Sequence, residues 1–261
     1  MKLPTLNQDW KARTPQLLWA VGGALMLLVV VVGIQRKNDA YTDNLVVEIA
    51  DLPSGNLIKE SDVRTLLQES FLQPFEGVPV EEVDVMRIER VLRRDPFIRN
   101  AEAYLDAQDH LHIEVEQRNP IVRIMDATGQ QYYLDVEGNK IPLSKHYTAR
   151  VPVASGSVPP YTVTYRDRKA HPLKDIYQLS LTLLRDPFMW ALVEQIYIGD
   201  DYKITLVPKL GQQKILLGTI ADLEDKLERL RIFYEEAMPH QGWQKYRELD
   251  LRFKGQVVGR K

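Results

Sequence analysis

Hydrophobic and polar positions alternate along the chain in patterns that predict an ordered succession of elements. The first regular stretch, residues 45–49, is typical of a β-strand. Apolar residues then recur twice at helical spacing, in a helix that Ser61 can cap and in a second helix that Asp84 can cap. Two alternating stretches follow, separated by a short turn, and predict antiparallel neighbouring strands. Residues 45–118 are therefore expected to form a small α+β module with two helices on one face of a sheet.

The pattern changes to hairpins near Pro120, and residues 119–258 are expected to form a second, mainly antiparallel β domain with flanking helices. Its helices are predicted over residues 177–184 and along an apolar stripe from Leu223 to Tyr234. The predicted strands and extended segments are 121–125, 131–134, 140–142, 194–198, 203–207 and 214–217.

The end of the chain alternates apolar and polar residues from Leu249 to Val257, which predicts a half-buried terminal strand. A strand with nothing after it leaves one edge of its sheet uncovered, and natural proteins usually protect such an edge. Two interpretations are open. Charged residues such as Arg252 and Lys254 protect the edge, or another chain pairs with it. Residues 259–261 are expected to be a short tail.

One segment, Leu17–Ile34, is strongly apolar and carries no charged residue. As a helix it would span about 27 Å, close to the roughly 30 Å hydrocarbon core of a bilayer. It is longer than the apolar part of a cleaved signal peptide, and a core helix is rarely apolar on all sides. We therefore expect a cytoplasmic tail (1–16), a single transmembrane helix (17–34), a tether (35–44) and a large domain outside the cytoplasmic membrane.

Composition excludes several classes of function. The 261 residues carry a formal net charge of −2, which gives no electrostatic argument for nucleic-acid binding. The chain has no cysteine, so disulfides, cysteine-ligated zinc and thiol catalysis are excluded. Neither G-x-S-x-G nor H-E-x-x-H occurs. We expect no enzyme activity and no cofactor, although an anchored hydrolase was weighed as an alternative.

Two sets of polar residues in the first module are candidate sites. His110, His112 and Glu114 lie on one face of a predicted strand and could hold a metal ion, but a solvated polar face is the favoured interpretation. Arg87, Arg90 and Arg94 crowd the second helix and are a candidate contact surface for an acidic partner or lipid head groups, with a solvated face as the alternative.

Several motifs, in their order and spacing, resemble a known family. The helix and strand from Val85 to Ala101 and the strand His110–Pro120 resemble a POTRA domain, with Gln117 where family members usually have an acid. The segments Tyr133–Gly138, Val151–Gly156 and Asp250–Val258 are similar to the β domain of the FtsQ/DivIB family of bacterial cell-division proteins. The resemblance covers nearly the whole chain.

The resemblance implies a non-enzymatic divisome scaffold at the division septum, in the inner membrane with its bulk in the periplasm. It implies FtsB and FtsL as partners, FtsW among the further divisome proteins, and a role in controlling septal peptidoglycan synthesis. It also implies that the terminal strand binds a strand of FtsB through Arg252, Phe253, Lys254, Gly255, Gln256 and Val257. The alternative is a component of envelope protein secretion or assembly, because POTRA modules also occur there.

Overall fold

The computed structural model describes residues 22–29, 41–72 and 74–261. Residues 22–29 form a helix. Among the described residues, no helix is long and apolar enough to cross a membrane. The predicted span over residues 17–34 lies mostly outside the described residues, as does the tether, and the predicted tail of residues 1–16 lies wholly outside them.

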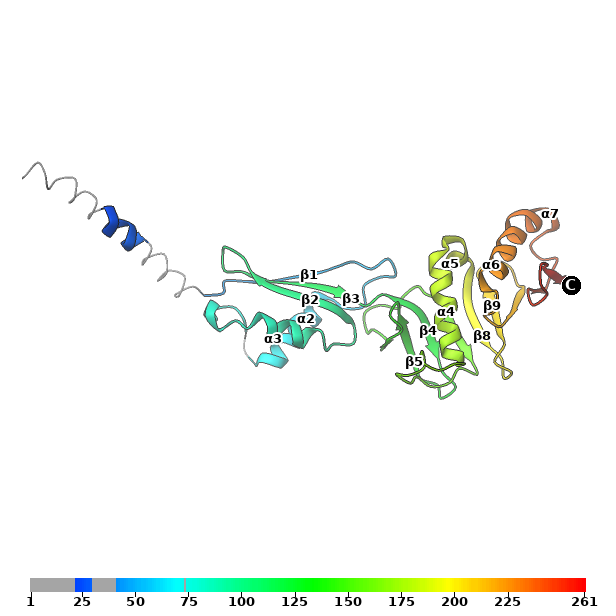
Figure 1. The fold of residues 1–261 in the computed structure, drawn as a ribbon, viewed down its shortest axis with the longest axis horizontal. Coiled ribbons are helices and arrows are strands. Elements are labelled where there is room, and N and C mark those ends of the chain that lie inside the picture. Colours follow the sequence, from blue (N-terminus) through cyan, green and yellow to red (C-terminus); the bar gives the residue numbers. More distant parts are fainter. Residues whose placement is uncertain (1–21, 30–40, 73) are drawn as a thin grey trace, which may run out of the picture.

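The first domain confirms the predicted order strand, helix, helix, strand, strand (Figure 1). Its elements are β1 (Leu45–Ile49), α2 (Glu60–Phe71), a short 3₁₀ helix (Val80–Glu82), α3 (Val85–Leu92), β2 (Ile98–Leu105) and β3 (Leu111–Gln117). The sheet has the order β1-β3-β2, with β2 antiparallel to β3 as predicted and β1 parallel to β3. Both helices lie on one side of it.

Alternation along β3 decides which face of this sheet is buried. Leu111, Ile113 and Val115 are buried against the helices, whereas Glu114 and Glu116 are exposed on the other face. The cap of α3 is as predicted, because Asp84 accepts a hydrogen bond from the Arg87 backbone N–H at 2.9 Å.

The prediction for the start of α2 is wrong. The helix begins at Glu60, one residue before Ser61, and Lys59 is the N-cap residue. The Asp62 carboxylate accepts the Lys59 backbone N–H at 2.9 Å, so an acid in the first turn takes over the capping that Ser61 was expected to supply.

The second domain contains one mixed sheet of order β12-β11-β10-β9-β8-β7-β4-β5-β6. Neighbours joined by hairpins are antiparallel, whereas the pairs β4–β7, β7–β8 and β10–β11 are parallel. The strands are β4 (Pro120–Met125), β5 (Gln131–Asp135), β6 (Lys140–Ile141), β7 (Val153–Gly156), β8 (Val193–Ile198), β9 (Ile204–Pro208), β10 (Lys214–Gly218), β11 (Glu248–Asp250) and β12 (Val258–Arg260). The helices are α4 (Pro172–Arg185), α5 (Pro187–Leu192), α6 (Leu223–Ile232), a π-helical turn (Phe233–Ala237) and α7 (Met238–Gln241).

Helices α4 and α6 supply apolar stripes to the core of this domain. Ile176 and Leu179 of α4 and Leu227 and Leu230 of α6 belong to one buried cluster with the inward residues of the sheet. Helix α4 begins five residues before the predicted position because His171 caps it and Pro172 occupies its first turn.

The two domains are joined by a small buried cluster and by polar contacts. Leu57 of the first domain packs with Tyr133, Ile141 and Ala149 of the second. Gln117, at the end of β3, is buried at the same junction, and its carbonyl oxygen accepts the backbone N–H groups of Leu57 and Ile58 at 2.9 and 3.2 Å. These bonds lie within the first domain and hold in place the loop from which Leu57 reaches the second domain.

Candidate functional site

The chain ends in a short hairpin instead of the predicted strand from Leu249 to Val257, so that prediction is wrong. Strand β11 stops at Asp250, residues 251–257 turn the chain, and β12 pairs antiparallel with β11. Gly255 has a φ of 73°, a left-handed conformation that glycine adopts without steric cost. Among the described strands, β12 forms one edge of the sheet and β6 the other.

Asp250 anchors this hairpin from inside the fold. Its side chain is fully buried, and its Oδ2 lies 2.6 Å from a guanidinium nitrogen of Arg252 and 3.4 Å from one of Arg260. The hydrogen bond from Arg252 lowers the pKa of Asp250 despite the opposing effect of burial. Arg252 at the start of the turn and Arg260 of the edge strand are thus held by one buried carboxylate.

Arg229 of α6 holds the turn from the helical side. Its guanidinium donates to the backbone carbonyls of Phe253, at 3.1 Å, and of Gln256. Asp225, one helical turn earlier, pairs with the same guanidinium at 2.9 Å. Arg229 therefore fixes the turn against α6.

A groove of about 290 Å³ lies between this turn and the end of α6, and we call it the terminal groove. It is lined by Arg229, Ile232, Phe233, Glu236, Ala237, Gly255, Gln256 and Val257. Its helical wall continues into the π-helical turn, a distortion that often occurs at functional sites. Ile232 is 43 % exposed and Phe253, on the adjacent turn, is 45 % exposed, so apolar surface is available here.

The six residues predicted to bind a partner are close in space but not equivalent. Gly255, Gln256 and Val257 line the terminal groove, whereas Phe253 and Lys254 are exposed at the turn. Arg252 turns to Asp250. The edge strand begins at Val258, just after the predicted set.

The three predicted arginines of the first domain separate into two places. Arg90 and Arg94 line a shallow surface pocket with Arg93, whereas the Arg87 guanidinium lies 4.9 Å from the centre of the Phe71 ring. The Arg93 guanidinium pairs with the Glu89 carboxylate at 3.1 Å and donates a hydrogen bond to the backbone carbonyl of Ala101. Arg90 and Arg94 form the exposed basic part of this surface.

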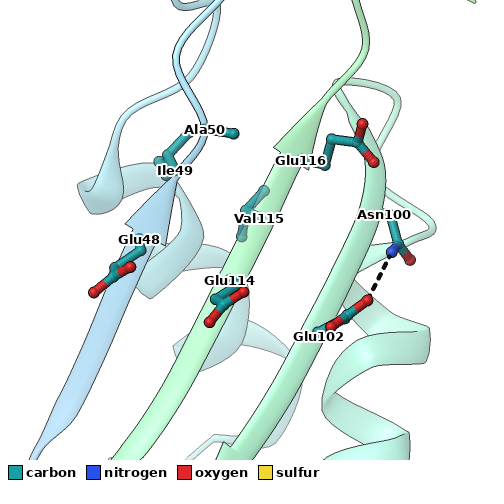
Figure 2. Close-up of a pocket in the computed structure, with 8 residues that line it drawn as sticks. All are labelled: Glu48, Ile49, Ala50, Asn100, Glu102, Glu114, Val115 and Glu116. Carbon is teal, nitrogen blue, oxygen red and sulfur yellow. Dashed lines mark hydrogen bonds between the residues drawn. The ribbon is translucent and has the colours of Figure 1, made fainter.

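The open face of the three-stranded sheet carries an acidic pocket of about 320 Å³ (Figure 2). Glu48, Glu102, Glu114 and Glu116 line it from all three strands. Glu116 is paired with Arg99 at 2.7 Å, and the Glu114 carboxylate accepts the Tyr104 hydroxyl at 3.0 Å. Two of the four glutamates therefore already have partners within the sheet, as is usual for polar residues on a solvent-exposed sheet face.

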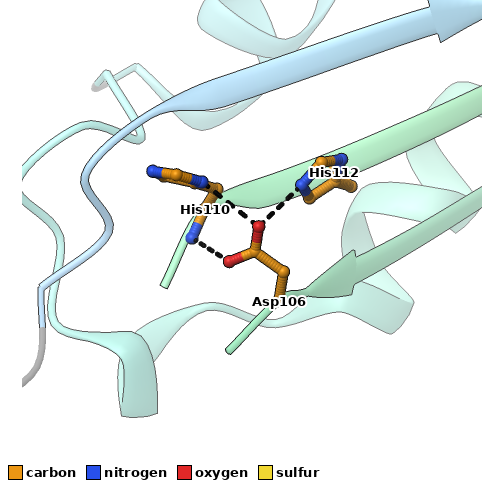
Figure 3. A group of neighbouring side chains, drawn as sticks. All are labelled: Asp106, His110 and His112. Carbon is orange, nitrogen blue, oxygen red and sulfur yellow. Dashed lines mark hydrogen bonds and ion pairs between the residues drawn. The ribbon is translucent and has the colours of Figure 1, made fainter. Parts of the chain in front are cut away.

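His110 and His112, which the sequence analysis grouped with Glu114, contact Asp106 instead. Glu114 bonds to Tyr104, and Asp106 of the β2–β3 turn lies between His110 and His112 (Figure 3). Asp106 Oδ2 is 3.1 Å from His110 Nδ1 and 2.9 Å from His112 Nε2. Burial raises the pKa of Asp106, but hydrogen bonds from the His110 backbone and the His112 ring outweigh it and lower the pKa to about 2. We call Asp106, His110 and His112 the hairpin cluster.

Comparison with known proteins agrees with this architecture. The family described as FtsQ/DivIB, C-terminal related, matches residues 119–260, and a POTRA-like domain matches residues 41–116. A cell division protein FtsQ from Rhodothermus marinus is 30 % identical over 196 residues, covering 70 % of this chain and 68 % of that protein.

The chain belongs to the FtsQ/DivIB family. A second relative, the cell division protein FtsQ from Salinibacter ruber, is 29 % identical over 190 residues, covering 70 % of this chain and 72 % of that protein. The FtsQ/DivIB match includes the terminal hairpin, the terminal groove and the edge strand.

Sequence reasoning missed two residues that organise these surfaces. Arg229 is one of several charged residues along α6, and nothing in its local pattern indicates that its guanidinium reaches a turn more than twenty residues later. Asp106 was missed although it directly precedes the turn between two alternating segments, where an aspartate commonly accepts backbone N–H groups.

Proposed function

We propose that this member of the FtsQ/DivIB family is a non-enzymatic divisome scaffold that binds FtsB- and FtsL-type proteins. The observation that carries the proposal is the terminal groove next to an open sheet edge. The edge strand offers backbone hydrogen bonds to an added strand. The groove offers an apolar surface, with Arg229 and Glu236 in its lining, to the residues that flank that strand. The cell-division names of the relatives support the same role.

The proposed organisation is a cytoplasmic tail over residues 1–16, a transmembrane helix over 17–34 and a tether over 35–44. The POTRA domain, 45–118, and the FtsQ-type β domain, 119–258, then lie on the outer side of the cytoplasmic membrane. From there the protein would contact FtsW and other septal proteins and help control septal peptidoglycan synthesis. In the POTRA domain, Arg87, Arg90 and Arg94 remain the proposed second contact surface, with Arg90 and Arg94 side by side.

The position of the edge strand changes which residues are expected to pair with a partner strand. Because β12 is the edge strand, we propose that a partner strand pairs with Val258–Arg260, and that residues 252–257 contact the partner through side chains and the turn. Edge protection by Arg260 and Lys261 is the competing interpretation, since short, charged edge strands resist unwanted pairing.

Replacing Phe253 by Asp tests the contact. Phe253 is 45 % exposed, so the Phe253→Asp protein is expected to keep its unfolding midpoint and to lose capture of an FtsB-type partner in co-purification. Val163→Asp is the matched control, because Val163 is an exposed apolar residue of the same domain that lies outside the terminal groove. Full partner capture by Phe253→Asp would refute the proposed contact.

The cellular role has its own test. A fluorescent tag on the N-terminus should form a band at midcell before constriction begins. A uniform envelope signal throughout division would refute the divisome role and favour a role in envelope protein secretion or assembly.

A further inference from the structure

The hairpin cluster lies at the tip of the β2–β3 hairpin, at the end of the first domain where the chain enters it (Figures 1 and 3). Helix α6 and the C-terminal end of the chain, which line the terminal groove, lie far from this hairpin in Figure 1, so the proposed partner contact does not use the cluster. Two imidazoles and one carboxylate point toward one another, and one ligand atom from each lies within 4.8 Å of the other two.

The distances suit a common metal ion. Ligand atoms about 2.0–2.2 Å from a metal are separated from one another by roughly 2.9–3.4 Å in octahedral or tetrahedral sites. Asp106 Oδ2 already lies 3.1 and 2.9 Å from the two histidine nitrogens. Small side-chain movements would therefore bring all three atoms to bonding distance of one ion.

The backbone holds the carboxylate in position for this task. Asp106 Oδ1 accepts the backbone N–H groups of Gln108 and His110, each at 2.9 Å. These bonds use one oxygen and leave the other facing the imidazoles. The ligand carboxylate is thus oriented by the turn itself, as the ligands of metal sites commonly are.

Neighbouring groups also orient both rings. The ring of His110 presents Nδ1 to the cluster and Nε2 to the Asp43 carboxylate, 3.4 Å away. A histidine that binds metal through one nitrogen usually donates its other N–H to a carboxylate or carbonyl. The His112 ring stacks on Tyr104, with ring centres 5.1 Å apart and planes 5° apart.

We propose that Asp106, His110 and His112 form a binding site for a divalent transition-metal ion of the zinc class. Imidazole nitrogen and carboxylate oxygen are both ordinary zinc ligands, and neutral imidazole is the form that binds. Three protein ligands leave at least one position for water. All three side chains are partly exposed, so an ion can enter from solvent.

The bound ion would tie the start of the first domain to its hairpin. Asp106 and both histidines belong to the hairpin, whereas Asp43 belongs to the segment that leads into β1. An ion on His110 would strengthen the attraction between the His110 Nε2 and the Asp43 carboxylate, now 3.4 Å apart, because a metal-bound imidazole is a better N–H donor. Metal binding and order at residues 41–44 are therefore expected to rise together.

The test is a zinc titration of the full-length chain, purified in detergent without a histidine tag and followed by isothermal calorimetry. One zinc ion per chain is expected, with matching changes in the NMR signals of the His110 and His112 ring nitrogens. Asp106→Asn keeps an oxygen for the backbone N–H groups but removes the carboxylate, and it should weaken zinc binding at least tenfold, as should His112→Ala. Asp43→Asn should weaken it about tenfold through loss of the outer carboxylate.

His146→Ala is the matched control. It also removes a half-buried imidazole paired with an acid, Asp62, but at a distance from the hairpin cluster, and it should leave zinc affinity unchanged. The absence of stoichiometric zinc binding to the unmodified chain would overturn the proposal. Equal affinity in the unmodified, Asp106→Asn and His112→Ala proteins would also overturn it, because zinc would then bind elsewhere.

Discussion

Gln117 shows how a single side-chain amide can hold a loop of the first domain, the loop from which Leu57 packs on the second domain. Its carbonyl oxygen accepts two backbone N–H groups, and its Nε2 donates to the carbonyl of Ala50 and to the side chain of Asn56, each at 3.1 Å. The POTRA resemblance of the sequence suggests an acid at this position. An ionised acid can accept the two N–H groups but has no hydrogen to give to Ala50, so the amide suits this junction better.

Replacement of Gln117 by Glu should therefore destabilise the protein. At neutral pH the new carboxylate would face the Ala50 carbonyl and the Asn56 oxygen, and we expect a loss of about 1–3 kcal/mol in the free energy of unfolding. Burial and the facing oxygens should raise the pKa of the introduced carboxyl, because both disfavour its charged form. The protonated acid can donate to Ala50, so the loss should shrink as the pH falls through that raised pKa.

Urea unfolding at several pH values measures this effect. Glu116→Gln is the control, because Glu116 is the exposed neighbour on the same strand and its substitution should cost less than about 1 kcal/mol. If the penalty of Gln117→Glu is the same at acidic and neutral pH, the proposed role of the Nε2 donor is wrong.

At the scale of elements, periodicity predicted the features that are set by residues close together in the sequence, such as strand positions, buried faces and one helix start. The alternation of Leu111, Ile113 and Val115 located β3 and its buried face, and Asp84 located the start of α3. The same alternation was misleading at the end of the chain. Leu251 is buried beyond the end of β11, and Val257 packs beside the core just before β12, so a hairpin reproduces the pattern of one strand. Parallel pairs such as β10–β11 depend on long crossovers, which local periodicity does not report.

The hydrogen bonds from Arg229 of α6 to the terminal turn can be tested by substitution. In Arg229→Met the apolar stem is retained but the donors to the Phe253 and Gln256 carbonyls are lost, so the turn should open from α6. Hydrogen exchange at residues 252–257 should become at least about fivefold faster, which corresponds to roughly 1 kcal/mol of local stability. Capture of the FtsB-type partner should weaken in parallel.

Arg247→Met is the control for this substitution, because Arg247 lies next to β11 but not in the terminal groove. Unchanged exchange in the turn of Arg229→Met would show that the hydrogen bonds from Arg229 do not hold it. Faster exchange with undiminished partner capture would show that the partner does not need an ordered turn.

At the scale of the whole molecule, the junction determines whether the two domains act as one body. The sequence indicated the two domains but not the contact between them, because its members come from separate parts of the chain. Asp62 of α2 is central to it, since its carboxylate lies 2.6 Å from His146 Nε2 and 2.9 Å from Lys145 Nζ of the second domain. Leu57 makes the apolar part of the same contact, and Gln117 holds the Leu57 backbone from within the first domain.

Protonation or removal of the Asp62 charge should loosen this junction. Burial raises the pKa of Asp62, but hydrogen bonds from Lys145, the Lys59 backbone and His146 outweigh it and lower the pKa. A lowered pKa means that the stabilisation is complete above the unfolded value of about 4 and is lost as the pH falls through the folded value. The titration of Asp62 should therefore leave the junction unchanged near neutral pH and weaken it only in acid.

Asp62→Asn should remove this acid dependence and loosen the junction at every pH. Because the carboxylate is partly exposed, we expect a cost of about 1–2 kcal/mol, seen as faster hydrogen exchange at residues 143–150. The Asn oxygen can still accept the Lys59 backbone N–H, so α2 should keep its cap. Glu69→Gln, an exposed change on the same helix, should leave exchange there unaltered. Exchange at residues 143–150 that is equal in Asp62→Asn and the unmodified protein would mean that the apolar cluster around Leu57 holds the domains together without the ion pair. Any acid dependence would then have to come from another group.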